Sequence, residues 1–111
     1  MLIYKILTTD QWSDLQRLGE TLGAPVDLAD GFVHFSTAAQ VRETAAKHFS
    51  GQDGLWLITM HADALGPALK WEPSRGGDLF PHLYGALKHA DVDQAVPLPL
   101  DGAGHVFPDG L

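Results

Sequence analysis

Gly31-Phe-Val-His-Phe-Ser-Thr37 carries the densest signal in the chain. Its apolar and polar residues alternate, which is typical of a strand with one buried face. The segment continues directly into Thr37-Ala-Ala-Gln40, a capping-box pattern that predicts the start of a helix. Val41, Ala45 and Phe49 would supply the buried face of that helix. The sequence therefore predicts a strand that leads without a long loop into a helix.

A second strand and helix are predicted upstream. Leu2–Leu7 is a β-prone run, and Thr8-Thr-Asp-Gln11 repeats the capping-box pattern. Residues 20–30 are rich in Gly, Pro and Asp and predict a loop. Between them, an apolar stripe at three-residue spacing predicts a helix that ends at Gly19, formed by Trp12, Leu15 and Leu18.

Downstream of the central stretch, the sequence predicts a turn and several strands. Leu55–Met60 is apolar on both faces, which is typical of a central strand covered on two sides. His61–Leu65 predicts a turn or a short helical turn. The prolines Pro81, Pro97 and Pro99 favour strand edges or ends. Further extended segments are expected at Ala68–Glu72, Phe80–Gly85 and Val92–Leu98. This order predicts an α+β fold, with a mainly antiparallel or mixed sheet and two main helices in a single domain over residues 1–111.

Composition excludes several classes of function. The chain has 111 residues, 45% of them hydrophobic, and a net charge of −7. This acidic balance argues against a partner as long and anionic as DNA or RNA. The absence of cysteine removes disulfides, thiolate metal sites and thiol nucleophiles. Because no apolar run approaches the ~20 residues that span a membrane, and no leader pattern is present, we expect a soluble cytoplasmic domain without a membrane partner.

The central stretch carries the first candidate site. Strand alternation places His34 and Ser36 on the face opposite Val33 and Phe35. The helix that starts at Thr37 would add free backbone N–H groups, which favour a phosphate or carboxylate. The alternative is structural: Ser36 or Thr37 only caps the helix, and His34 is a half-buried strand residue.

The second candidate site is Phe80-Pro-His-Leu-Tyr-Gly85. In an extended conformation Phe80, His82 and Tyr84 share one face and could stack on a flat ring and bond to it. Glu72 adds a carboxylate on the same face as Lys70. The alternatives are an aromatic cluster at the edge of the core and a surface ion pair of little energetic weight. The six histidines show no metal-binding spacing, so no metal site is predicted.

Taken together, four blocks resemble the bacterial domain-of-unknown-function family 952. They occur in order over nearly the whole chain: Tyr4-Lys5, Asp30–Gln40, Leu69–Glu72 and Phe80–Gly85. The resemblance implies a fold like that of ADP-ribosyltransferases, a split antiparallel β-sandwich with a cleft for a nicotinamide dinucleotide. The resemblance leaves the cofactor unknown and makes NAD a candidate. It also makes a nucleotide or another phosphate-bearing small molecule the candidate ligand.

A more distant similarity connects the chain to the RNA 2′-phosphotransferases of that superfamily. Leu2–Ile6, Val33–Ser36 and Leu57–Ala64 resemble segments of those enzymes. Lys5 stands where they have a cofactor-contacting histidine, and Arg42 and Arg75 are the nearest candidates for their catalytic arginines, although neither sits in a matching motif.

If the chain is an enzyme, the resemblance implies a transferase that acts on NAD or an ADP-ribose-like ligand. Glu72 and His34 would then be catalytic, with Glu72 stabilising positive charge on the ribose. The ligand-binding residues would be Lys5, His34, Ser36, Thr37, His82 and Tyr84. The alternative is a non-catalytic binding or protein-interaction module that has kept the fold and lost the chemistry.

Overall fold

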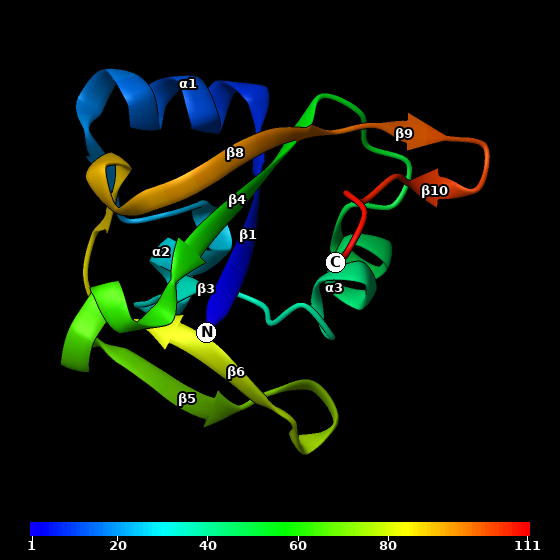
Figure 1. Cartoon of the computed structure of the whole chain (residues 1–111). Coiled ribbons are helices and arrows are strands. Elements are labelled where there is room, and N and C mark those ends of the chain that lie inside the picture. The colour runs from blue at the N-terminus through cyan, green and yellow to red at the C-terminus, as the bar shows by residue number, and fades with distance from the viewer.

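The computed structural model describes the backbone of residues 1–111 and every side chain except that of Arg75. Two antiparallel three-stranded sheets form its framework (Figure 1). The first has the order β1-β4-β8, with β1 at Leu2–Thr8, β4 at Leu55–His61 and β8 at Val92–Leu98. The second has the order β3-β6-β5, with β3 at Val33–His34, β6 at Leu79–Leu83 and β5 at Leu69–Pro73.

The two sheets meet at one isolated bridge between Tyr4 of β1 and Ser36. The backbone N–H of Tyr4 donates to the carbonyl of Ser36 at 2.8 Å, and the N–H of Ser36 donates to the carbonyl of Tyr4 at 2.8 Å. The strand expected over Gly31–Thr37 is therefore shorter than predicted, since only Val33–His34 and this bridge are paired.

Three α-helices and several short elements complete the chain. The α-helices are α1 (Thr9–Leu18), α2 (Pro25–Asp30) and α3 (Val41–His48). Turns of 3₁₀ helix are η1 (Ala62–Ala68), η2 (Arg75–Gly77) and η3 (His89–Asp91). Two strand pairs are β2 (Glu20–Thr21) with β7 (Leu87–Lys88), and β9 (Leu100–Asp101) with β10 (Gly104–His105). The α+β class is confirmed.

The start and the end of α1 follow the sequence prediction. The side chain of Thr8 accepts from the N–H of Gln11 at 3.1 Å, and the side chain of Gln11 accepts from the N–H of Thr8 at 2.9 Å. Both halves of the capping box are thus present. The helix ends at Gly19, whose φ of 85° is a left-handed conformation that favours glycine.

Two sequence predictions on helices are wrong. Residues 20–30 are not a loop throughout, because α2 begins at Pro25, a residue well suited to the first helical turn. The second capping box is only half formed: the side chain of Gln40 accepts from the N–H of Thr37 at 3.0 Å, and the helix starts at Val41.

The position predicted for Pro81 is also wrong, because β6 is the middle strand of its sheet. Pro81 has no N–H to donate, yet its carbonyl accepts from the N–H of Phe35 at 3.0 Å. Phe35 lies just beyond the end of the short β3, so the missing donor falls where regular pairing has already stopped. By contrast, Pro97 lies on β8, an edge strand as predicted.

The first sheet has a core on each face. On one face Ile3, Leu7 and Ile58 pack with Trp12 and Leu15 of α1. On the other face β1 and β4 pack against α3, in a cluster that includes Tyr4, Ile6, Leu57, Val41 and Ala45. This two-sided burial confirms the prediction for Leu55–Met60. None of the helices described is long and apolar enough to cross a membrane.

Candidate functional site

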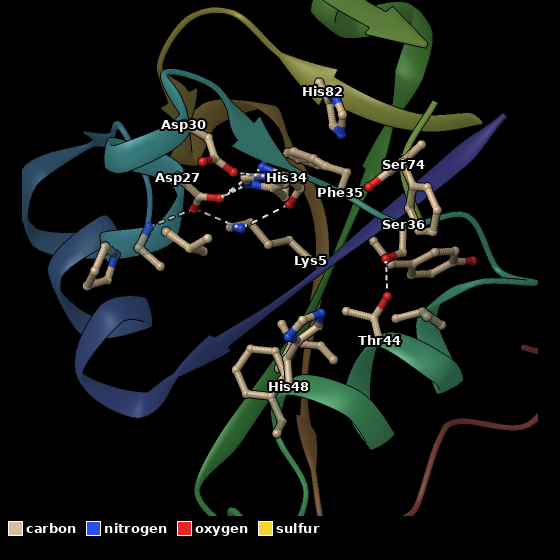
Figure 2. Close-up of a pocket in the computed structure, with 18 residues that line it drawn as sticks. Lys5, Asp27, Asp30, His34, Phe35, Ser36, Thr44, His48, Ser74 and His82 are labelled. Atoms are coloured by element: carbon tan, nitrogen blue, oxygen red, sulfur yellow. Dashed lines mark hydrogen bonds and ion pairs between the residues drawn. The ribbon is translucent and has the colours of Figure 1, made fainter. Parts of the chain in front are cut away.

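A cavity of about 530 Å³ lies where the two sheets separate (Figure 2). Its walls come from β1, α2, β3, α3 and β6. Four aromatic residues are part of its lining, namely Tyr4, Phe35, Phe49 and Phe80. The polar side chains that line it are Lys5, Asp27, Asp30, His34, Ser36, Thr44, His48, Ser74 and His82. This mixture of apolar walls and a set of convergent polar groups is typical of a small-molecule site.

An ion pair between Lys5 and Asp27 forms the base of one wall. The ammonium of Lys5 lies 3.0 Å from Oδ2 of Asp27, and 8% and 0% of the two side chains are exposed. Lys5 also donates to the carbonyl of His34 at 2.9 Å. Burial lowers the pKa of Lys5, and this effect exceeds the opposing attraction of Asp27.

Asp27 is the hub of the hydrogen bonds around α2. Its Oδ2 accepts from the N–H of Ala24 at 2.7 Å, and its Oδ1 accepts from the N–H of His34 at 3.0 Å. Burial alone would raise the pKa of Asp27, but the bonds from His34 and the charge of Lys5 together lower it to about 2. Asp27 therefore stays ionised and ties α2 to both β1 and β3.

The imidazole of His34 is held on both sides by carboxylates. Its Nδ1 lies 2.6 Å from Oδ1 of Asp27, and its Nε2 lies 2.9 Å from Oδ2 of Asp30. A neutral imidazole carries one N–H, whereas the imidazolium carries two and donates to both acceptors. The two carboxylates differ in access, because the side chain of Asp27 is 0% exposed and that of Asp30 is 47% exposed.

On the opposite wall Ser36 is buried, and its Oγ lies 2.9 Å from Oγ1 of Thr44 on α3. Thr44 in turn donates to the carbonyl of Gln40 at 3.2 Å. These contacts join the end of the second sheet to α3 on the far side of the cavity from Asp27 (Figure 2).

The second candidate cluster reaches the cavity through His82. Nδ1 of His82 lies 2.9 Å from Oε1 of Glu72, and the hydroxyl of Tyr84 donates to the same oxygen at 2.7 Å. The hydrogen bond from Tyr84, and to a smaller extent that from His82, lowers the pKa of Glu72. The hydrogen bond to Glu72 raises the pKa of Tyr84. The ring of Phe32 packs on His34, His82 and Tyr84, with centroids 4.5, 4.1 and 5.2 Å apart.

The cavity brings together four of the residues expected at the site from sequence: Lys5, His34, Ser36 and His82. The described lining does not include Thr37, Glu72 or Tyr84. Glu72 pairs with His82 and Tyr84, and no ion pair joins it to Lys70 among the described side chains.

Neither arginine considered from sequence can be assigned to the cavity. The guanidinium of Arg42 donates to the carbonyl of Leu111 at 2.6 Å and lies 5.0 Å from the ring centroid of Phe107. The side chain of Arg75 lies outside the described part of the structure.

Sequence reasoning missed Asp27, Asp30, Thr44 and Phe32. Asp27 and Asp30 fall in the segment that the sequence predicts to be a loop, and a loop gives no helical face on which to place them. The four-residue spacing between Asp30 and His34 was a usable signal, because the turn at Gly31 joins α2 directly to β3. Among the described residues, no group of three or more His, Asp and Glu side chains could hold a metal ion.

The family model described as "Protein of unknown function (DUF952)" matches residues 6–95. The chain belongs to this family. The family resemblance expected from the sequence blocks is thereby confirmed. A search of curated proteins gave no match.

Two solved structures of protein CC0527 from Caulobacter crescentus are similar to this DUF952 chain. The crystal structure is 48% identical, covers 95% of this chain and 92% of that one, and gives a TM-score of 0.91. The solution NMR structure is 49% identical, covers 94% and 90% of the two chains, and gives a TM-score of 0.84. Each match spans at least 94% of this chain at a TM-score of 0.84 or more, and so supports the architecture described above.

Proposed function

We propose that the cavity binds a small nucleotide or a related phosphate-bearing ligand, and that the chain acts as a binding domain of ADP-ribosyltransferase-like form. The observation that carries this proposal is that Lys5, His34, Ser36 and His82, from three segments of the chain, line one cavity of about 530 Å³. A volume in this range suits a ligand of nucleotide size. The opening between two antiparallel sheets also fits the split form implied by the family resemblance.

The aromatic lining supports a flat ring as one part of the ligand. Phe35 and Phe80 line the cavity and both are buried, so the ring would replace water against apolar surface. The imidazole of His82 is a further ring at the same wall, and Phe32 stacks on it in a tilted arrangement. A purine or nicotinamide ring is the class of group that such a wall accommodates.

A phosphate group would enter at His34. Lys5 is already neutralised by Asp27, so it offers little attraction to an anion. Nε2 of His34, however, faces only the half-exposed Asp30, which can turn into solvent and leave this donor to a phosphate oxygen. In this proposal the ligand replaces one carboxylate and leaves the buried Asp27 in place.

The position of Glu72 supports binding rather than transfer of an ADP-ribose group. A carboxylate that stabilises charge on a ribose must lie against that ribose. Glu72 is instead held by His82 and Tyr84, behind the imidazole that faces the cavity. Neither NAD chemistry nor a catalytic role for Glu72 is needed for the proposed binding.

A second candidate function is a protein-interaction module, favoured by exposed apolar side chains near α2. Four aliphatic side chains between the end of α1 and the end of α2 are each 59–61% exposed, namely Leu18, Leu22, Val26 and Leu28. Surfaces of this kind often contact another protein. A ligand screen separates the two candidates, because this surface does not require the cavity.

A thermal-shift screen tests the proposal with NAD, ADP-ribose and AMP at millimolar concentration. We expect at least one nucleotide to raise the Tm, because a ligand that binds the folded state alone stabilises it. His34→Ala should abolish the shift, whereas His61→Ala, which removes an exposed imidazole paired with Asp93, should retain it. No shift with any of the three nucleotides would refute the proposal.

A further inference from the structure

His82 is a buried imidazole with one nitrogen committed and the other directed to the cavity. It lies on β6, the middle strand of the second sheet, and is 5% exposed. Nδ1 is bonded to Glu72 at 2.9 Å. Within the described residues, Nε2 has no hydrogen-bond partner, and Figure 2 shows the ring pointing into the cavity that it lines.

The bond to Glu72 determines which nitrogen of His82 carries the proton. An ionised carboxylate only accepts hydrogen bonds, so Nδ1 must be the donor. Glu72 is kept ionised because the hydroxyl of Tyr84 also donates to its Oε1 at 2.7 Å. In the neutral imidazole Nε2 is then unprotonated, and it presents a lone pair to whatever occupies the cavity.

The neighbouring histidine is in the opposite situation. The ring centroids of His34 and His82 are 5.3 Å apart, yet both nitrogens of His34 face carboxylates, those of Asp27 and Asp30. Both nitrogens of His34 thus face acceptors, whereas Nε2 of His82 itself offers an acceptor. Two imidazoles on adjacent strands therefore have complementary hydrogen-bonding roles toward one ligand.

We propose that Nε2 of His82 accepts a hydrogen bond from a hydroxyl group of the ligand, and that Glu72 and Tyr84 are positioning residues that hold the imidazole in this tautomer. The inference rests on the proposed nucleotide-binding function and names the ligand group that this wall recognises. A carboxylate that fixes the tautomer of a histidine is the arrangement by which an imidazole is aimed at a hydroxyl. The cost of burying a polar imidazole without a partner for Nε2 is recovered when a hydroxyl donates to it.

The tautomer is tested first, on the full chain without ligand, by the ¹⁵N chemical shifts of the imidazoles. We expect His82 to be the Nδ1–H tautomer, and Glu72→Gln to change its ¹⁵N shifts toward a mixture of tautomers. Asp93→Asn is the matched control, because it alters an exposed carboxylate–histidine pair, that of His61, and should leave His82 unchanged. An Nε2–H tautomer for His82 would overturn the proposal.

Binding is tested by calorimetry with adenosine and 2′,3′-dideoxyadenosine, which differ only in ribose hydroxyls. We expect adenosine to bind at least tenfold more tightly, His82→Phe to reduce this preference to less than twofold, and Glu72→Gln to reduce it partly. Equal affinities in the unmodified chain would refute the role of His82 and leave nucleotide binding intact. Failure of adenosine, AMP and NAD alike to bind would refute the proposed function, and the hydroxyl contact with it.

Discussion

Oδ2 of Asp27 lies 3.0 Å from Nζ of Lys5, with 0% and 8% of the two side chains exposed. A buried pair of this kind costs desolvation free energy that its mutual attraction offsets only while both partners are present. The pair is therefore a sensitive point of the fold as well as one wall of the cavity.

Replacing Asp27 should destabilise the chain strongly. Asp27→Asn leaves the ammonium of Lys5 buried without an opposite charge, and we expect a loss of about 3–5 kcal/mol in the free energy of unfolding. Urea unfolding measures this loss. Asp14→Asn removes an exposed ion pair with Arg17 and should cost less than about 1 kcal/mol. Similar losses in the two variants would contradict the role assigned to Asp27.

Stability should fall as the pH is lowered from about 4 toward 2. The pKa of Asp27 is about 2 in the folded chain against 3.8 ordinarily, so the unfolded chain takes up its proton at higher pH. The stabilisation by Asp27 is complete above its pKa in the unfolded chain and is lost as the pH falls through its pKa in the folded chain. The free energy of unfolding changes by roughly 2 kcal/mol in this range.

Carboxyl ¹³C NMR checks this pH dependence directly, because it follows Asp27 within the folded chain. A midpoint near 4 for Asp27 would show that its bonds to Lys5 and His34 do not stabilise the ionised form. Urea unfolding at pH 4.5 and 2.5 then gives the corresponding loss of stability.

Gly23→Ala should cost more than its backbone conformation alone explains. Gly23 has a φ of +106°, and a Cβ at this position would overlap the side chain of Asp27. We expect a loss above about 2 kcal/mol, the sum of backbone strain and a displaced Asp27. Gly51→Ala is the matched control, since Gly51 has a φ of +75° and open space around its Cβ. If chemical denaturation gave equal losses, close packing at Asp27 would not be the cause.

Asp30→Asn should strengthen the binding of an anion. The substitution removes a half-exposed negative charge that lies 2.9 Å from Nε2 of His34, so a phosphate would no longer compete with a carboxylate. We expect the Kd for AMP to fall roughly threefold to tenfold at low salt, with a smaller effect at high salt. Calorimetry measures the change, and Asp14→Asn controls for net charge. An unchanged or weaker affinity would place the phosphate elsewhere.

The parts of the fold that could be predicted from sequence are those set by local patterns. The capping box at Thr8 and Gln11 needs only four consecutive residues, and the two-sided burial of Leu55–Met60 follows from its composition. The helix α2 was missed because its Gly-, Pro- and Asp-rich sequence is also typical of loops. What stabilises it is the long-range bonding of Asp27 to Lys5 and His34.

The candidate site shows the same division. His34 and Ser36 could be placed on one face by the period of a strand, and both line the cavity. That Glu72 bonds to His82 depends on the register between β5 and β6, which no local pattern specifies. Because of this register, Glu72, which the sequence places beside a ligand, bonds to His82 and is not part of the described cavity lining.

The bridge between Tyr4 and Ser36 determines which main-chain groups face the cavity. Antiparallel pairing that continued from this bridge would place Ile6 opposite His34 as its next rung. The backbone N–H and C=O of His34 are instead bonded to the side chains of Asp27 and Lys5. The side chains of Lys5 and Asp27 therefore take the place of Ile6 as hydrogen-bond partners of His34, and β1 and β3 do not pair at this position.

As a result, the backbone N–H and C=O of Ile6 do not pair with His34. Residues two apart in a strand direct their backbone groups to the same side, so the N–H and C=O of Ile6 point away from β4, as those of Tyr4 do. Ile6 also lines the cavity. In the proposed complex a ligand at this wall would meet one main-chain donor and one main-chain acceptor of Ile6. Because every residue type except proline carries both groups, this contact would persist whatever side chain stands at position 6, and no sequence motif records it.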